Sequence, residues 1–251
     1  MTDARYDSIG TNYAATRREE PRFMQLIDAA LGDARTVVNV GAGTGSYEPR
    51  GRLVIAVEPS DVMAAQRPAD RVPAIRASAG SLPLRDRSVD AAMTILSLHH
   101  WDAEQESGVR ELRRVARGPV VILTCDPEVS GEMWLMSDYL TEVAELDRRT
   151  FPSLAQLATW LGGEVTITTV PIPSDTCDWS LMSFWAHPER VLDPVARNAT
   201  SGFARMSSDV VERVVNDVRR DLESGVWDER YGWLRSLEEF DAGLRLVVAQ
   251  Q

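Results

Sequence analysis

A run of β-branched residues that leads into closely spaced glycines is the feature that most constrains this chain. In "VVNVGAGTGSYE", residues 37–48, an apolar strand candidate is followed by Gly41, Gly43 and Gly45. Glycine has no Cβ, so such a loop lets the main chain approach a ligand closely. The segment therefore predicts a binding loop at the end of a strand.

Short β-branched runs alternate with helical patterns over most of the 251 residues. Strand candidates lie at 37–40, 54–57, near 75, 91–96, 120–124, 165–170 and 243–249, with helix candidates that include 21–31 and 104–115. Strands alternating with helices predict right-handed crossovers and a mainly parallel sheet. We expect an α/β, doubly wound fold with seven strands.

The region after the sixth strand has a different pattern. Residues 173–241 are mostly helical, and "SSDVVERVVNDVRRDLESG" is the clearest helix, with Ser207 or Ser208 as its cap and Gly225 at its end. We expect residues 1–172 and 242–251 to form an α/β core. Residues 173–241 are then a helical insertion between the last two strands.

The residues after the glycines argue against phosphate binding. A P-loop needs a lysine and a Ser or Thr after its last glycine, whereas Gly45 is followed by Ser46, Tyr47 and Glu48. A dinucleotide loop has the form Gly-x-Gly-x-x-Gly, and Ser46 stands where the third glycine belongs. Glu48 also places an anion near the loop, which weakens the dinucleotide interpretation.

Glu58 ends the second strand candidate, 17 positions after Gly41. In a doubly wound sheet the end of the second strand lies beside the first loop, where a carboxylate can accept both hydroxyls of a ribose. A solvent-facing acid at a strand end is the structural alternative. The spacing favours the ribose, and the loop favours a nucleoside with little or no phosphate.

Three segments in order resemble the class I S-adenosylmethionine-dependent methyltransferases, closest to the branch that acts on small molecules. They are "VVNVGAGTGSYE", "VIAVEPSDVM" and "ASAGSLPLRDRSVDAAMTILSLHHW". The resemblance covers roughly residues 6–170 and the last strand. It implies a Rossmann-like fold and S-adenosylmethionine as cofactor. Its sulfonium cation suits a lysine-free loop beside Glu58 and Glu48.

The resemblance also implies a set of cofactor-binding residues. "YDSIGTNYAATR" is similar to the family's N-terminal lid helix, and the set is Tyr13, Arg17, Asn39, Gly41, Ala42, Gly43, Glu58, Pro59, Ser60, Met63, Ser78, Ala79, Ser97 and Leu98. Asn39 and Ser78 stand where the family usually has Asp, and Ala42 replaces a common Cys. Neither Asn nor Ser supplies charge.

"SLHHW", residues 97–101, follows the fourth strand and lies at the expected ligand edge. His99 or His100 is a candidate general base, and a packing role is the alternative. A base is needed only if the acceptor must lose a proton. Oxygen, nitrogen, an enol-like carbon and a carboxylate remain open as acceptors.

Aromatic side chains are the candidates for substrate contact: Trp101, Trp134, Tyr139, Trp179 and Trp185. The helical insertion is expected to close over the acceptor as a lid, where aromatic faces suit an apolar ligand. Packing of the insertion onto the sheet explains its tryptophans equally well. "AQRPADR" (65–71) and "ELDRRT" (145–150) are expected to be a solvated loop and a charged helix end without function.

The composition of the chain limits the classes of molecule that it is expected to bind. A net charge of −11 disfavours nucleic acids and anionic membranes. Cys125 and Cys177 match no metal or redox spacing, and with three histidines we expect no metal site and a cytoplasmic protein. The predicted partner is a small-molecule acceptor. The alternatives are non-methylating chemistry such as cyclisation, a nicotinamide oxidoreductase, and a catalytically silent binding protein.

Overall fold

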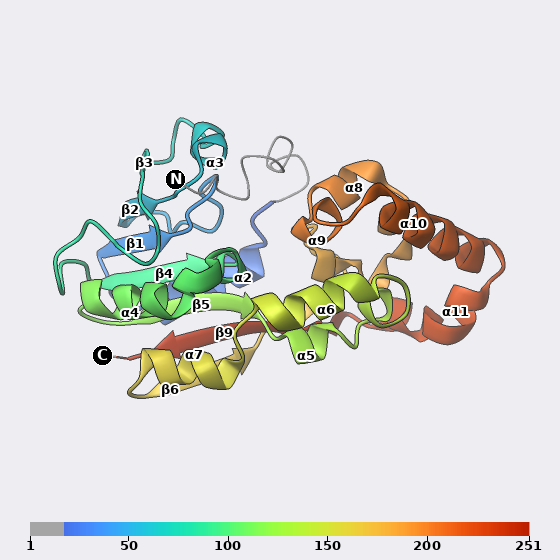
Figure 1. Cartoon of the computed structure of the whole chain (residues 1–251). Coiled ribbons are helices and arrows are strands. Elements are labelled where there is room, and N and C mark those ends of the chain that lie inside the picture. Colours follow the sequence, from blue (N-terminus) through green and yellow to red (C-terminus); the bar gives the residue numbers. More distant parts are fainter. Residues whose placement is uncertain (1–17, 251) are drawn as a thin grey trace.

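A seven-stranded sheet with helices on both faces forms the centre of the computed structural model, which describes residues 18–250 (Figure 1). The strand order is β3-β2-β1-β4-β5-β9-β6. Its strands are β1 (Thr36–Val40), β2 (Leu53–Val57), β3 (Ala74–Ile75), β4 (Ala91–Ile95), β5 (Val120–Cys125), β6 (Val165–Thr169) and β9 (Leu244–Ala249). Only β9 runs antiparallel to its neighbours, β5 and β6. The predicted α/β fold and all seven strands are confirmed.

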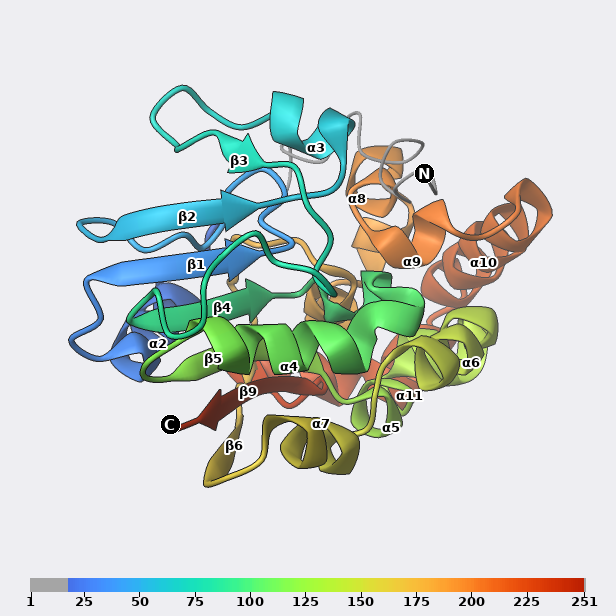
Figure 2. The ribbon, with the colours of Figure 1, turned by 60° about the vertical axis from the view of Figure 1, so that its left-hand side comes forward.

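Two apolar layers bury the sheet, which explains why its central strands are almost continuously hydrophobic. On one face Ile27 and Leu31 of α2 pack with Met93 of β4. On the other, Val109 and Leu112 of α4 pack with the opposite faces of β1, β4 and β5 (Figure 2). The helices of the core are α2 (Pro21–Leu31), α3 (Asp61–Ala65), α4 (Gln105–Val115), α5 (Pro127–Ser130), α6 (Thr141–Thr150) and α7 (Leu154–Leu161).

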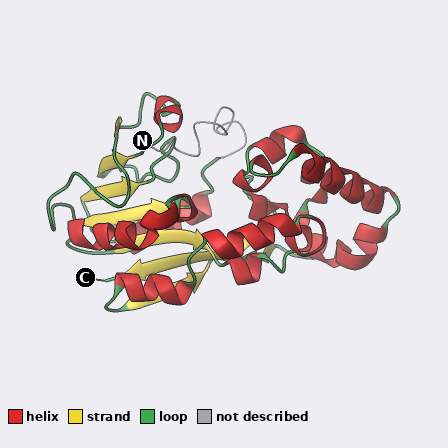
Figure 3. Ribbon diagram, viewed as in Figure 1, coloured by secondary structure: helices red, strands yellow, loops and turns green. Residues whose placement is uncertain are grey.

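The chain between β6 and β9 forms a mostly helical insertion. It contains α8 (Pro194–Asn198), α9 (Ser201–Ala204), α10 (Ser208–Glu223), α11 (Val226–Tyr231) and the 3₁₀ turns η5 (Leu181–Ala186), η6 (Pro188–Val191) and η7 (Gly232–Ser236). Two short strands, β7 (Ile172–Pro173) and β8 (Glu239–Phe240), pair antiparallel where the insertion leaves and returns. The helices α8 to α11 gather at the end to which β4 and β5 point (Figures 1 and 3).

The predicted helix in the insertion is α10. Ser207 occupies the cap position, although its side chain makes no capping hydrogen bond, and Gly225 follows the helix with φ +79°. No helix among residues 18–250 combines the length and apolar character needed to cross a membrane.

Glu20 ties the start of α2 to the start of the insertion. Its buried carboxylate accepts hydrogen bonds from Arg22, from Thr176 Oγ1 (3.1 Å) and from the Cys177 N–H (3.2 Å). Burial alone would raise the pKa of Glu20. The hydrogen bonds outweigh it, first that of Arg22, and hold the pKa at about 2 instead of 4.5.

Replacing Glu20 with Gln should lower the free energy of unfolding by about 2 kcal/mol at pH 7 because it removes hydrogen bonds to a charged group. A lowered pKa means that this stabilisation is complete above pH 4.5 and is lost as the pH falls toward 2. Denaturant unfolding at pH 7, 5 and 3.5 should therefore show that the difference in unfolding free energy between the wild type and Glu20→Gln shrinks as the pH falls. The exposed partner of Arg22 provides a control, since Asp175→Asn should change stability by less than about 0.5 kcal/mol. A Glu20→Gln deficit that is constant with pH would contradict this assignment.

Candidate active site

The strand order reverses between β1 and β4, and the carboxyl ends of these strands define the site. The glycine loop leaves β1 and is tied to β2, because the N–H groups of Gly41 and Ala42 both donate to Val57 O (2.9 and 3.0 Å). Gly41 has φ +70°. A Cβ at Gly41 would lie 2.2 Å from Ser97 Oγ, so the loops after β1 and β4 meet at a point where only glycine fits.

Glu58, at the end of β2, is buried beside the glycine loop. Its two carboxylate oxygens accept the N–H groups of Gly43 and Ser60, each at 2.8 Å. Ser60 in turn caps α3 by accepting the Met63 N–H at 3.2 Å. These backbone donors fix the plane of the carboxylate at the point where the loop, β2 and α3 converge.

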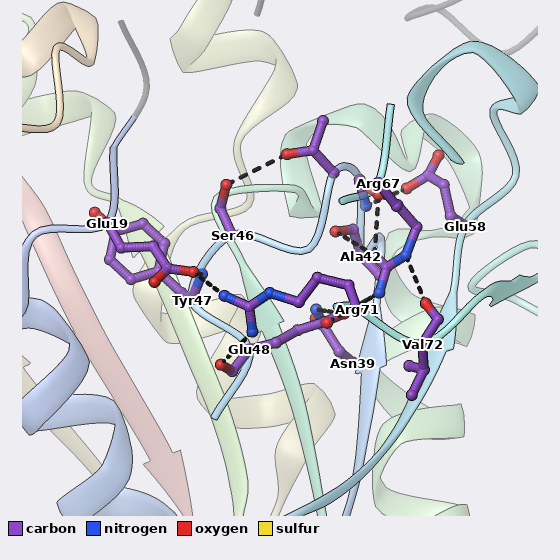
Figure 4. Close-up of polar contacts among 12 residues, drawn as sticks. Glu19, Asn39, Ala42, Ser46, Tyr47, Glu48, Glu58, Arg67, Arg71 and Val72 are labelled. Atoms are coloured by element: carbon purple, nitrogen blue, oxygen red, sulfur yellow. Dashed lines mark hydrogen bonds and ion pairs between the residues drawn. The ribbon is translucent and has the colours of Figure 1, made fainter. Parts of the chain in front are cut away.

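No helix follows the glycine loop. Between β1 and β2 the described chain, residues 41–52, forms turns only. Behind the loop lies a buried ion pair in which Arg67 donates to both carboxylate oxygens of Glu48 at 2.8 and 2.9 Å (Figure 4). Arg67 also donates to Gly43 O (3.1 Å) and Val72 O (2.8 Å). The ion pair thus supports the loop in the place where a helix would begin in a dinucleotide fold.

Two expectations for this region are wrong. The stretch 65–71 is not a simple solvated loop, because the Arg67 side chain is only 4% exposed and Arg71 bridges Glu19 and Glu48 O. Glu48 is not an unbalanced anion beside the ligand site, since Arg67 neutralises it. Of the two predicted acids, Glu58 is the one whose charge is directed to the loop.

Asn39 now has a physical explanation. Its Nδ2 donates to Glu48 Oε1 at 3.2 Å in a fully buried position (Figure 4). An aspartate at position 39 would place two carboxylates in hydrogen-bonding contact away from water, which is unfavourable. The departure from Asp therefore accompanies the Glu48–Arg67 pair.

A hollow lies beyond β4. It is a cavity of about 70 Å³, lined by Leu96, His99, Cys125, Met136, Asp147, Phe151 and residues 180–182 and 200–202. Leu96, directly after β4, has φ +52°, a left-handed conformation that a leucine adopts at a cost. This turn separates the cavity from Ser97 and the glycine loop. The core and the insertion each supply part of the cavity wall.

Asp147 is the cavity residue that the sequence analysis missed. It lies on α6, four residues after the buried Val143, so helical periodicity puts it on the inward face of the helix. Burial raises the pKa of Asp147 to about 6, although Arg205, whose guanidinium is 3.6 Å away, opposes the shift. Asp147 is therefore a largely buried residue of α6, which the description of 145–150 as a charged helix end did not foresee.

His99 lines the same cavity from the short turn η2 (Leu98–His100). Its ring stacks on Phe151 with centroids 4.4 Å apart and is 3.8 Å from the ring of His100. His100 is not part of the cavity lining. Of the two predicted base candidates, the geometry favours His99.

Comparison with known proteins now identifies the family. The model of a methyltransferase domain family matches residues 38–122, from β1 to β5. The structure of a candidate methyltransferase from an antibiotic biosynthesis pathway of Anabaena variabilis is 31% identical in sequence, with a TM-score of 0.88 over 95% of this chain and 100% of that one. The chain belongs to the S-adenosylmethionine-dependent methyltransferases.

More distant structures share the fold of this methyltransferase. The [4+2]-cyclase SpnF has a TM-score of 0.54 at 18% identity, with 98% of this chain and 92% of that chain covered. The geranyl diphosphate C-methyltransferase of Streptomyces coelicolor has a TM-score of 0.51 at 14% identity, with 92% and 78% covered. No curated protein matches the chain.

The residues at the glycine loop fit S-adenosylmethionine, the methyl donor of the family. The loop opens no helix N-terminus that could bind a pyrophosphate, and its nearby arginine Arg67 is already paired with Glu48. Glu58 supplies an oriented anion for a ribose and a cationic ligand. Within residues 18–250, no group of three or more His, Cys, Asp or Glu side chains is arranged to hold a metal ion.

The predicted cofactor residues fall into two groups. Asn39, Gly41, Ala42, Gly43, Glu58, Ser60, Met63, Ser97 and Leu98 surround the ends of β1, β2 and β4, while Pro59 beside them is exposed. Ser78 and Ala79 lie beyond β3, where Ala79 packs in the same apolar layer as Trp101. Tyr13 and Arg17 lie outside the described residues.

The predicted substrate-binding aromatics are not in the cavity lining. Trp134 is buried, donates from Nε1 to Trp185 O at 2.9 Å and packs edge-on against Trp227. Trp185 is fully buried against Phe240. These contacts make both tryptophans part of the core that attaches the insertion to the sheet, which corrects their assignment to substrate contact.

The other three aromatics differ in position. Tyr139 is buried and its hydroxyl donates to Asp221 at 2.8 Å, so it joins α10 to the core. Trp179 lies under the guanidinium of Arg190. Trp101 packs against Gly108 with its Nε1 close to Gly41, which places it on the glycine-loop side of the site.

Replacing Gly41 with Ala should destabilise the protein by about 3 kcal/mol because the new Cβ combines a left-handed φ with a clash against Ser97. Gly51→Ala is the matched control, since Gly51 has φ +79° and open space around its Cβ position. Its cost should be about 1 kcal/mol, from the backbone alone. Thermal and denaturant unfolding measure both variants. Equal losses would show that contact with Ser97 does not require a glycine.

Replacing Asn39 with Asp should cost about 2 kcal/mol because it buries a second carboxylate against Glu48. The deficit should be larger at pH 8 than at pH 5, where protonation of one carboxyl relieves the repulsion. Adding Glu48→Gln to this variant restores one amide and one carboxylate and should recover part of the loss. A double-mutant cycle of unfolding free energies measures the coupling. Additive effects would contradict the assigned contact.

Proposed function

We propose that this methyltransferase modifies a small molecule whose reacting group occupies the cavity between His99 and Asp147. The observation that carries the proposal is the position of this cavity next to the glycine loop. Leu96 lines the cavity, and the next residue, Ser97, lies against Gly41 of the loop, whose N–H at Gly43 is held by Glu58. This is the arrangement that a transfer between two bound molecules requires.

S-adenosylmethionine supplies the methyl group, already activated by a positively charged sulfur. The protein's own contribution is then to bind, to orient and to exclude water. Glu58 accepts the ribose hydroxyls, and the glycine loop gives the ligand access to the main chain. Because Arg67 is neutralised by Glu48, the loop presents no unbalanced cation to a cationic ligand.

The acceptor side is shaped by the insertion. Residues 180–182 and 200–202 of the insertion contribute to the cavity wall together with His99 of the core. We infer that residues 173–241 act as a substrate-binding lid on the α/β core of 1–172 and 242–251.

His99 is positioned to contact the acceptor. Stacking on Phe151 restricts its ring, and the imidazole borders the cavity. A neutral imidazole can accept a hydrogen bond from an acceptor group or donate one to it.

The two cysteines, Cys125 and Cys177, are not joined by a disulfide, which supports a cytoplasmic location.

Two alternative activities make different predictions. The cyclase SpnF shares the fold, so formation of S-adenosylhomocysteine in parallel with a methylated acceptor is the result that separates methyl transfer from cyclisation. A nicotinamide oxidoreductase needs a pyrophosphate site, and the turns of residues 41–52 do not provide a helix N-terminus for one.

Titration calorimetry of the purified protein should show binding of S-adenosylmethionine and S-adenosylhomocysteine, and no binding of NAD. Replacing Glu58 with Gln should weaken S-adenosylhomocysteine binding by about 1.5–3 kcal/mol, roughly 10- to 150-fold, because it removes charged hydrogen bonds to the ribose. Asp61→Asn is the matched control. Asp61 is an exposed carboxylate three residues away and should not affect affinity. Binding of NAD in place of the sulfur nucleoside would refute the proposed function.

A further inference from the structure

The lining of the acceptor cavity contains one carboxylate, that of Asp147. Asp147 of α6 lines the cavity, and Arg205, directly after α9, lies behind it. We propose that Asp147 selects an acceptor that carries an O–H or N–H group, an alcohol or an amine, and rejects a carboxylate. The inference rests on the proposed function, because it assigns the chemical class of the acceptor in the same cavity.

The geometry keeps the Asp147–Arg205 pair incompletely closed. The shortest nitrogen–oxygen distance between the side chains is 3.6 Å, which is longer than a charged hydrogen bond. The side chains are 15% and 9% exposed, so both lie largely inside the protein. Arg205 therefore lowers the energy of the buried carboxylate without occupying it as a short salt bridge would.

The surroundings leave Asp147 as the acidic group of the cavity lining. The other ionisable residues of that lining are His99 and Cys125. Burial raises the pKa of the Cys125 thiol to about 12, so it stays uncharged. Two neighbouring carboxylates form ion pairs with other arginines: Glu128 of α5 pairs with Arg148, and Glu142 of α6 pairs with Arg213.

Charge and hydrogen bonding then determine the acceptor class. A carboxylate acceptor would meet the negative charge of Asp147 in a poorly solvated space, where repulsion is strong. An alcohol or amine instead donates a hydrogen bond to the Asp147 carboxylate. As the acceptor oxygen or nitrogen forms its bond to the methyl carbon, the electron pair of the methyl–sulfur bond would remain on sulfur, and the O–H or N–H proton of the acceptor would move to an Asp147 oxygen. A pKa raised toward neutrality suits that exchange.

Small probes of matched size can test this selectivity without knowledge of the natural substrate. Propylamine, 1-propanol and propionate are titrated into protein labelled with ¹³C at the methionine methyl groups. Met136 and Met182 line the cavity and report binding locally through their methyl resonances. The titrations are done with S-adenosylhomocysteine present, and its own binding is measured separately by calorimetry.

At pH 7.5 propylamine should bind about tenfold more tightly than propionate, with 1-propanol between them, since only the amine is attracted by a full charge. Lowering the pH to 5 protonates Asp147 and should remove most of this preference. The resonances of Met136 and Met182 should titrate near pH 6. His99→Gln should retain that transition, whereas Asp147→Asn should abolish it together with the preference for the amine.

Asp138→Asn provides the matched control. Asp138 is a carboxylate nearby in the chain that pairs with Arg230 and Tyr231 and does not line the cavity, so wild-type selectivity is expected. Equal or tighter binding of propionate by the wild-type protein, no response to any probe, or a pH 6 transition that persists in Asp147→Asn would each overturn the inference. The wild-type titrations need no variant to fold. A failure of S-adenosylhomocysteine binding would instead refute the proposed function.

Discussion

The buried ion pair between Glu48 and Arg67 is the interaction on which the cofactor side of the structure depends. Taking both charges out of water is unfavourable unless their hydrogen-bonding capacity is met. Arg67 meets this condition by donating to both oxygens of Glu48 and to three backbone carbonyl groups. The pair connects the glycine loop to the segment after α3. It replaces the packing that a helix between β1 and β2 would provide, and it leaves Glu58 as the acid that faces the loop.

The end of β4 divides the site into two chemical environments. On one side Ser97 contacts Gly41 and the end of β1, where hydrogen bonds and charge dominate. On the other side Leu96 borders a cavity whose lining combines apolar and hydroxyl side chains with His99 and the single carboxylate of Asp147. The left-handed conformation of Leu96 stores strain of about 1–3 kcal/mol at this boundary, and strain of that kind concentrates at functional positions.

Local sequence signals predicted the strands, the glycine loop and the proximity of Glu58, because each follows from residue type, periodicity and the topology of a doubly wound sheet. The Glu48–Arg67 pair could not be predicted in the same way. It joins residues 19 positions apart across an irregular segment, and arginines beside Pro and Asp have the composition of a solvated loop. Asp147 was accessible in principle, since Val143 and Asp147 are one helical turn apart, but a run of charged residues concealed it. The tryptophans of the insertion were assigned from residue type alone. Aromatic residues are common both in cores and in ligand pockets, so only the contacts in the structure distinguish the two roles.

Tyr47 links the two halves of the enzyme. It belongs to the glycine loop, yet its hydroxyl accepts the Glu20 N–H and donates to Asp178 at the start of the insertion. The insertion is therefore not an interchangeable module. A chimera that joins the lid of another methyltransferase to this core would need a hydrogen-bond acceptor at position 178, or it would leave a buried phenol unsatisfied next to the cofactor loop and weaken both parts together.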